Sequence, residues 1–203
     1  MDKKGVQLKV GSLYIMLTIP ASALVDPKAS SSNALSARFH AFCDITIPER
    51  RGAKHLFEEL LYWDIYIHKS ETGGGTVYRV SKYDNKQTAT TEMQLDVREV
   101  ENVRDLSHVI GLAKVVHLAP TLVPAVDEVI RLQKDWSKGA CNSCVWTFTL
   151  LNILDMAVNG EPNEGATLSL DLYKDFILNW LHGMDHARLK RTRPGAVHRL
   201  DCL

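Results

Sequence analysis

The residues best suited to chemistry lie in one short segment, Gly139 to Trp146, which contains the cysteines Cys141 and Cys144. Asn142 and Ser143 both favour the N-cap position of a helix, because a short side-chain oxygen accepts a hydrogen bond from an N–H of the first turn. A thiol in that turn feels the positive end of the helix dipole, which stabilises the thiolate. We therefore predict Cys144 as the candidate nucleophile, with Cys141 just outside the helix.

The same two cysteines allow other interpretations. Cys144 can pack as a small apolar residue, since cysteines outside disulfides are among the most buried residue types. The Cys-x-x-Cys spacing also occurs in redox dithiols and in half of a zinc site. A zinc site needs two further ligands, for which the sequence offers only the pair His182 and His186. A redox dithiol is expected earlier in the fold, after a strand, so we predict no metal and no other cofactor.

A cysteine nucleophile needs a base, which is most often histidine. Because side chains alternate along a strand, Tyr62, Asp64 and His68 share one face of the strand predicted over residues 61–68. His68 is one candidate base, although it lies about 20 Å along a straight strand from Tyr62; the alternative is a solvated residue at a strand end. His117 is a second candidate base, but a lone histidine in an apolar run is more often structural.

The order of the elements predicts an α+β fold, with an antiparallel sheet followed by a late buried helix and a packing helix. Period-two, β-rich segments give way after Pro120 to helical spacing. Hairpin chemistry at Thr72 to Gly75 joins two of the strands. Strands are predicted at 6–19 (interrupted at Gly11), 39–47, 61–68, 76–83, 92–100 and 109–118, and helices at about 122–136, 144–158 and 168–181.

Two of the predicted helices differ in their apolar faces. The 144–158 helix has almost no polar face, so we expect it inside the molecule. The 168–181 helix is expected to bury Leu168, Leu172, Phe176 and Trp180. Residues 1–183 are predicted to form one domain, and residues 184–203 a basic, loosely held tail.

Composition limits the functions open to the chain. The 203 residues are 45% hydrophobic and 24% charged, which is typical of a globular protein. The 24 basic residues balance the 24 acidic ones, so nucleic acid is not the expected partner, and the run Arg188 to Arg193 is the one local alternative. The apolar stretch from Leu13 to Pro20 is too short to span a membrane. Four cysteines are too few for a disulfide scaffold, which favours a reducing, cytoplasmic location.

Three short motifs carry a resemblance to a known group. They are Tyr62-Trp-Asp-Ile-Tyr-Ile67, Gly75-Thr-Val-Tyr-Arg-Val80 and Asn142-Ser-Cys-Val-Trp146. Together they resemble the pattern of small, mostly uncharacterised fungal proteins with a circularly permuted papain-like layout, similar to NlpC/P60 or LRAT domains. The resemblance covers about residues 61–162. It implies a papain-like fold in which the strand motif and the helix start face one site.

The resemblance implies one of two functions. The first is a cysteine-dependent hydrolase or acyl transferase that acts on an amide, ester or thioester. The alternative is a non-catalytic papain-like domain that binds a protein partner or a small metabolite. Tyr62, which stands where the family has its histidine, favours this alternative, whereas the cysteine at the helix start favours the enzyme. The candidate catalytic residues are Cys144, His68 and His117, and the candidate binding residues are Tyr62, Trp63, Asp64, Cys141, Asn142 and Trp146.

Overall fold

The computed structural model describes residues 8–18, 61–85, 90–103, 106, 109–134, 142–159, 164–183 and 199–200. Five longer strands and three helices fall within these ranges. In chain order they are β1 (Ser12–Thr18), β2 (Tyr62–His68), β3 (Gly75–Asn85), β4 (Thr90–Val100), β5 (Val109–His117), α3 (Val123–Leu132), α4 (Ser143–Asn159) and α5 (Glu164–Gly183), followed by the two-residue strand β6 (Arg199–Leu200).

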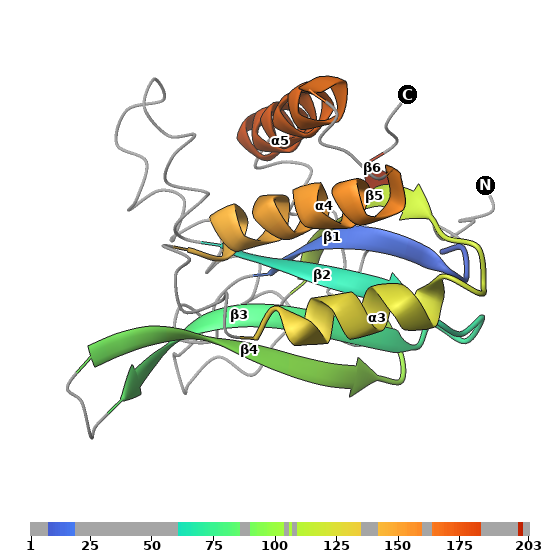
Figure 1. Cartoon of the computed structure of the whole chain (residues 1–203), viewed down its shortest axis with the longest axis horizontal. Coiled ribbons are helices and arrows are strands. Elements are labelled where there is room, and N and C mark those ends of the chain that lie inside the picture. Colours follow the sequence, from blue (N-terminus) through green and yellow to red (C-terminus); the bar gives the residue numbers. More distant parts are fainter. Residues whose placement is uncertain are drawn as a thin grey trace.

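The strands form one sheet in the order β4-β3-β2-β1-β5-β6 (Figure 1). All neighbouring pairs are antiparallel except β5 and β6, which run parallel. The α+β class and the order of strands before helices are therefore confirmed. β1 lies between β2 and β5, so the first strand in the chain becomes central to the sheet, and every one of its residues is buried.

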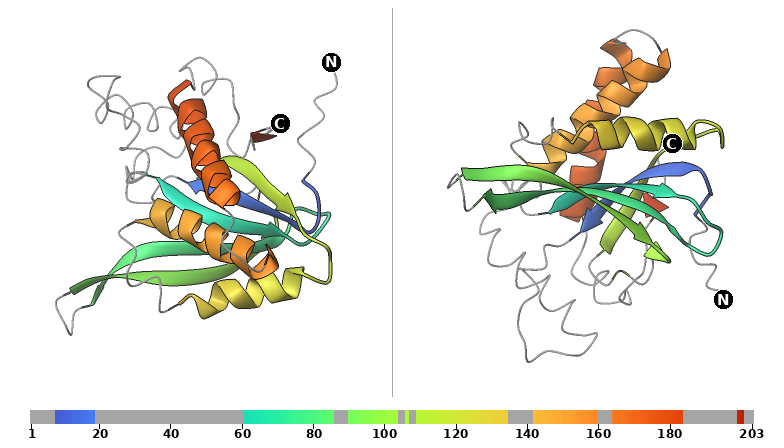
Figure 2. Two further views of the ribbon diagram at one scale, coloured as in Figure 1. Left: turned by 45° about the horizontal axis from the view of Figure 1, so that its top comes forward. Right: turned by 60° about the horizontal axis from the view of Figure 1, so that its bottom comes forward.

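Alternation along the strands divides the side chains between two faces. One face, called here the helix face, packs against α3, α4 and α5 and carries residues such as Ile15 and Ile65. The opposite face carries a separate apolar cluster that includes Tyr14, Met16 and Tyr66. Figures 1 and 2 show α3 and α4 lying across the helix face. The two faces have different chemistry, which decides where the predicted site residues lie.

The α4 helix is the main cover of the helix face. It begins at Ser143, as predicted, and the Asn142 side-chain oxygen accepts a hydrogen bond from Val145 N–H at 2.9 Å. This is an N-cap interaction, which satisfies one N–H of the first turn. Most of α4 is buried, although Val145 and Met156 are exposed on its outer side.

The predicted apolar face of the third helix is partly wrong. Leu172 and Phe176 are exposed by 62% and 42%, whereas Ile177 and Leu178 of α5 are buried. The error has a simple cause, because the leucine-rich segment offers apolar residues on more than one side and only contact with the core selects the buried side. The side chains of Leu168 and Trp180 lie outside the described residues.

Two predicted features of the β region change in the structure. Gly11 is not a bulge within a strand; it lies in the turn before β1, with a φ of +77° that favours glycine. The predicted strand at 39–47 lies outside the described residues. Of the predicted tail, Arg199–Leu200 pair with Leu112 and Ala113 of β5, and the other tail positions are also outside the described part of the chain.

Candidate functional site

Cys144 lies in the first turn of α4, as expected, but its side chain has no solvent exposure. It belongs to the apolar cluster on the helix face, together with Trp63 and Trp146. Cys144 is not part of a disulfide. The thiol thus has the helix position of a nucleophile and the surroundings of a core residue.

The start of α4 is attached to the start of β2 through backbone groups. The Trp63 N–H donates to Ser143 Oγ at 3.1 Å, and Thr147 Oγ1 donates to the Trp63 carbonyl at 2.5 Å. The β2–β3 register runs from Ile65 to His68, so Trp63 lies just beyond it. Two hydroxyl groups of α4 thus bond the backbone of β2 at this point, as a buried backbone group requires hydrogen-bond partners.

His68 lies at the other end of β2 and is buried, so the interpretation as a solvated strand-end residue is wrong. Its Nδ1 lies 2.8 Å from the Tyr66 hydroxyl, which in turn donates to the Gly73 carbonyl at 2.9 Å. The single hydroxyl hydrogen of Tyr66 is used for the carbonyl, so Nδ1 of His68 must carry a hydrogen and donate. Burial raises the pKa of Tyr66, which keeps this hydroxyl protonated. His68 thereby stabilises the β2–β3 turn.

The structure does not bring Cys144 and His68 together. Tyr66 and His68 form an aromatic contact on the face opposite the helices, whereas Cys144 belongs to the helix face. His68 also lies six residues beyond Tyr62, about 20 Å along the strand. A direct proton transfer between the two side chains is incompatible with this arrangement.

Tyr62 and Asp64 belong to a charged network on the face opposite the helices. Asp64 is fully buried and accepts hydrogen bonds from Arg79 Nε at 3.0 and 3.1 Å and from Thr18 Oγ1 at 3.1 Å. The Arg79 guanidinium also lies 4.7 Å from the centre of the Tyr62 ring. Burial raises the pKa of Asp64, and the guanidinium of Arg79 opposes that rise. This network joins three strands and does not face Cys144.

Trp146 and Cys141 are the other two predicted binding residues in the segment around Cys144. Trp146 is buried in the helix-face cluster, and its indole nitrogen has no hydrogen-bond partner among the residues that the structure describes. Cys141 lies outside those residues. Trp63, Asn142 and Trp146 are thus grouped at one end of the sheet, around Cys144.

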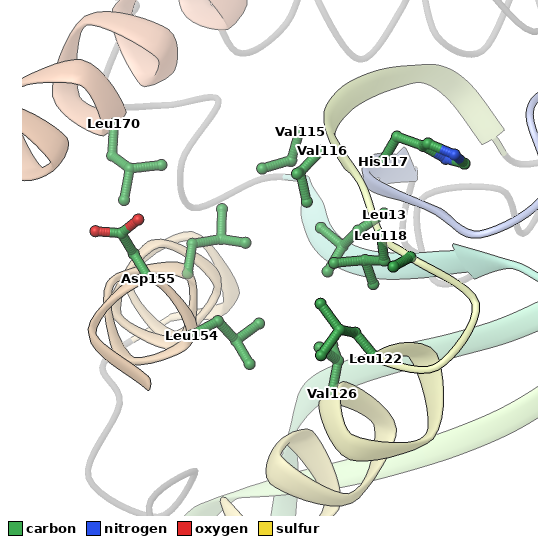
Figure 3. Close-up of a pocket in the computed structure, with 12 residues that line it drawn as sticks. Leu13, Val115, Val116, His117, Leu118, Leu122, Val126, Leu154, Asp155 and Leu170 are labelled. Carbon is green, nitrogen blue, oxygen red and sulfur yellow. The ribbon is translucent and has the colours of Figure 1, made fainter. Parts of the chain in front are cut away.

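A pocket of about 430 Å³ opens at the other end of the sheet (Figure 3). Five elements (β1, β5, α3, α4 and α5) and the loop after β5 form its walls, which are almost wholly aliphatic. The lining residues are Leu13, Val115, Val116, His117, Leu118, Ala119, Leu122, Val126, Leu151, Leu154, Asp155 and Leu170. Sequence reasoning missed this pocket, because single aliphatic residues on distant segments carry no local signal.

Among the described lining residues of the pocket, two side chains are ionisable. Asp155 lies on α4 beside Leu170, and His117 lies at the end of β5 with its imidazole directed away from the aliphatic walls (Figure 3). His117 Nδ1 is 3.3 Å from Ser12 Oγ. Partial desolvation and the positive charges of Lys9 and Lys114 lower the pKa of His117. His117 is exposed, and it lies at the pocket end of the sheet, away from Cys144 at the start of α4.

No group of three or more His, Cys, Asp or Glu side chains in the described part of the chain could hold a metal ion. No helix in the described ranges is long and apolar enough to cross a membrane.

Comparisons with known proteins give no match: no family model fits the chain, and no curated protein or solved structure is similar to it. Of the two ends of the sheet, one holds an enclosed thiol and the other holds an open aliphatic pocket.

Proposed function

We propose that this domain binds a small, mainly apolar molecule in the pocket at the end of β5. The observation that carries the proposal is the aliphatic lining, which comes from β1, β5, α3, α4 and α5 at once. A volume of about 430 Å³ falls within the range of small-molecule sites, roughly 300–1,000 Å³. Ligand binding would remove exposed apolar surface such as that of Val116 and Leu122 from water.

The ligand class follows from the few polar groups at the pocket. Aliphatic walls favour a hydrocarbon or ring system and give little selectivity between molecules of similar size. Asp155 is the carboxylate that lines the pocket, so a hydroxyl or amine on the ligand would orient toward it as a hydrogen-bond donor. A small metabolite with an apolar body and one donor group fits this description.

The fold that we propose for this binding domain is a permuted papain-like fold, and the proposed location is the cytoplasm. The contacts of Trp63 with Ser143 and Thr147 support the layout, because the strand motif and the helix-start motif of the resemblance are adjacent. The Cys144 thiol, which is not in a disulfide, supports a reducing compartment. A non-catalytic role agrees with Tyr62 in the histidine position and with the separation of His68 from Cys144.

A cysteine-dependent hydrolase or acyl transferase is the second candidate. It is favoured by the position of Cys144 in the capped first turn of α4, where the helix dipole stabilises a thiolate. The enclosure of the thiol opposes it, because an acyl carbon must approach the sulfur within bonding distance. We therefore place ligand binding first.

Binding can be tested by calorimetric titration with straight-chain alcohols from butanol to decanol. Each added methylene that enters the pocket is worth about 0.8 kcal/mol, or roughly a fourfold gain in affinity, until the pocket is full. Leu122→Trp would fill the mouth of the pocket and weaken binding at least about tenfold. Leu132→Trp is the matched control, since Leu132 ends the helix that Leu122 caps, is 70% exposed and is not among the lining residues of the pocket.

Two results would contradict the proposal. One is the absence of saturable binding for every alcohol in the series. The other is an equal effect of Leu122→Trp and Leu132→Trp, which would locate binding elsewhere on the molecule.

A further inference from the structure

β4 is the outermost strand on one side of the described sheet (Figure 1). The β2–β3 pairing ends at Ile65 and Tyr78, but β3 and β4 continue together as far as Asn85 and Thr90. Residues 79–85 and 90–96 thus form a ribbon that pairs only with itself among the described strands. A two-stranded ribbon is marginal in water, and an exposed edge strand is a ready template for another strand.

The direction of the backbone groups on β4 follows from the hydrogen bonds further inside the sheet. The His68 carbonyl accepts from Gly11 N–H, on the β1 side, so even-numbered residues of β2 face β1 and odd-numbered ones face β3. Carried through the registers of β2–β3 and β3–β4, this alternation points the N–H and C=O groups of the five odd-numbered β4 residues outward. They are Thr91, Met93, Leu95, Val97 and Glu99.

The side chains of β4 are complementary to the same strand in the reverse direction. We propose that β4 pairs with β4 of a second copy of this chain, antiparallel and centred on Leu95. All eleven residues from Thr90 to Val100 then overlap, because Leu95 is the midpoint of the strand. On one face Met93 lies opposite Val97 of the second copy, and on the other face Glu92 lies opposite Arg98.

Charge supports this register and the choice of a second copy as the partner. Arg98 is half-exposed and 3.2 Å from Asp96 of its own strand, so the pairing sets Glu92 beside an existing pair of charges. Gln94 would lie opposite Asp96, an amide donor facing a carboxylate. If the centre of the pairing moves from Leu95 to Asp96, Asp96 lies opposite Asp96 of the second copy. If the centre moves to Val97, Leu95 lies opposite Glu99. Like charges directly opposite each other are destabilising.

This interface lies on the edge of the sheet away from β5, so it is independent of the pocket. Sedimentation velocity across the micromolar range should give a species of twice the 22.8 kDa chain mass. Val97→Pro should shift this species to the monomer, because it removes an outward N–H and leaves the β3–β4 ladder intact. Val97→Ala is the control, since it shortens the side chain, keeps the N–H and should remain dimeric.

A second pair of variants tests the register even if the proline variant misfolds. Arg98→Glu places a carboxylate opposite Glu92 of the second copy and should weaken self-association at least about tenfold. Glu92→Arg combined with Arg98→Glu restores opposite charges and should recover the dimer. The proposal is overturned by a wild type that is monomeric throughout, by a dimer that persists in Val97→Pro, or by a double variant that fails to recover.

Discussion

The two faces of the sheet are both buried, but they are built from different chemistry. The helix face is apolar and encloses Cys144 among aliphatic and aromatic side chains. The opposite face contains the Asp64–Arg79 pair and the hydrogen bond between His68 and Tyr66. The candidate nucleophile Cys144 and the candidate base His68 therefore lie on opposite faces of the same sheet. The stability of the opposite face, called here the polar face, depends on every buried polar group having a hydrogen-bond or ion-pair partner. The stability of the helix face depends on apolar packing and on a few hydroxyl hydrogen bonds.

The largest effect should come from breaking the charged pair on the polar face. Asp64→Ala leaves the Arg79 guanidinium largely buried, with 15% side-chain exposure, and should lower the free energy of unfolding by about 3–5 kcal/mol. Urea denaturation measures the change. Asp175→Ala, on the exposed side of α5, is the control and should stay within about 0.5 kcal/mol of the wild type. A similar loss for both variants would contradict the difference between the faces.

A smaller effect is expected where the helix face uses a hydroxyl. Thr147→Val removes the donor to the Trp63 carbonyl, and an unsatisfied buried acceptor costs about 1–3 kcal/mol. Thr149→Val is a matched control two residues further along α4, because Thr149 is only half-buried and its hydroxyl donates to the Val145 carbonyl of its own helix. Thermal unfolding should separate the two variants. If they are equally stable, the hydrogen bond from Thr147 to the Trp63 carbonyl does not contribute to holding α4 on β2.

The enclosure of Cys144 predicts slow alkylation. In native protein, iodoacetamide should modify Cys144 at least about tenfold more slowly than a free cysteine at the same pH, because reaction requires local opening. Peptide mapping distinguishes Cys144 from the other cysteines, and the urea-unfolded chain gives the reference rate. Modification faster than the reference, with an apparent pKa below the usual thiol range, would instead favour the hydrolase.

The smallest expected effect is at the pocket edge, where His117 titrates. Its imidazole should titrate below the ordinary histidine pKa of about 6.5. The sign follows from linkage: a lowered pKa means that the unfolded chain binds more protons, so any contribution of His117 to stability grows as the pH rises through this range. NMR titration measures the pKa directly, and Lys114→Gln should raise it. An unchanged pKa in that variant would exclude Lys114 as a cause.

Local patterns were sufficient for most elements and for the start of α4. Asn142 caps the helix as its side chain predicts, and the β2–β3 hairpin forms around Gly73, whose φ of +104° few other residues adopt. Alternation also grouped Tyr62, Asp64 and His68 correctly on one face. The sequence could not predict which face α4 covers, and that choice separates Cys144 from His68, whereas His117 lies at the pocket end of the sheet.

Burial was harder to predict from the chain alone. His68 and Asp64 are polar residues, yet both are buried because they have hydrogen-bond partners. His68 is bonded to Tyr66 of its own strand, whose hydroxyl reaches the Gly73 carbonyl, and Asp64 is bonded to Arg79 and Thr18 of the neighbouring strands. The exposed Leu172 and Phe176 show the converse, because apolar residues at helical spacing do not by themselves select the buried side.

The sequence by itself determined the class of fold, the order of its elements and the helix position of Cys144, because strand alternation, turn residues and helix caps act over a few neighbouring residues. The tertiary structure alone decided that Cys144 is enclosed and His68 lies across the sheet, and it assembled the aliphatic pocket from five elements. Such features depend on contacts between segments far apart in the chain, whose free energy no local pattern contains.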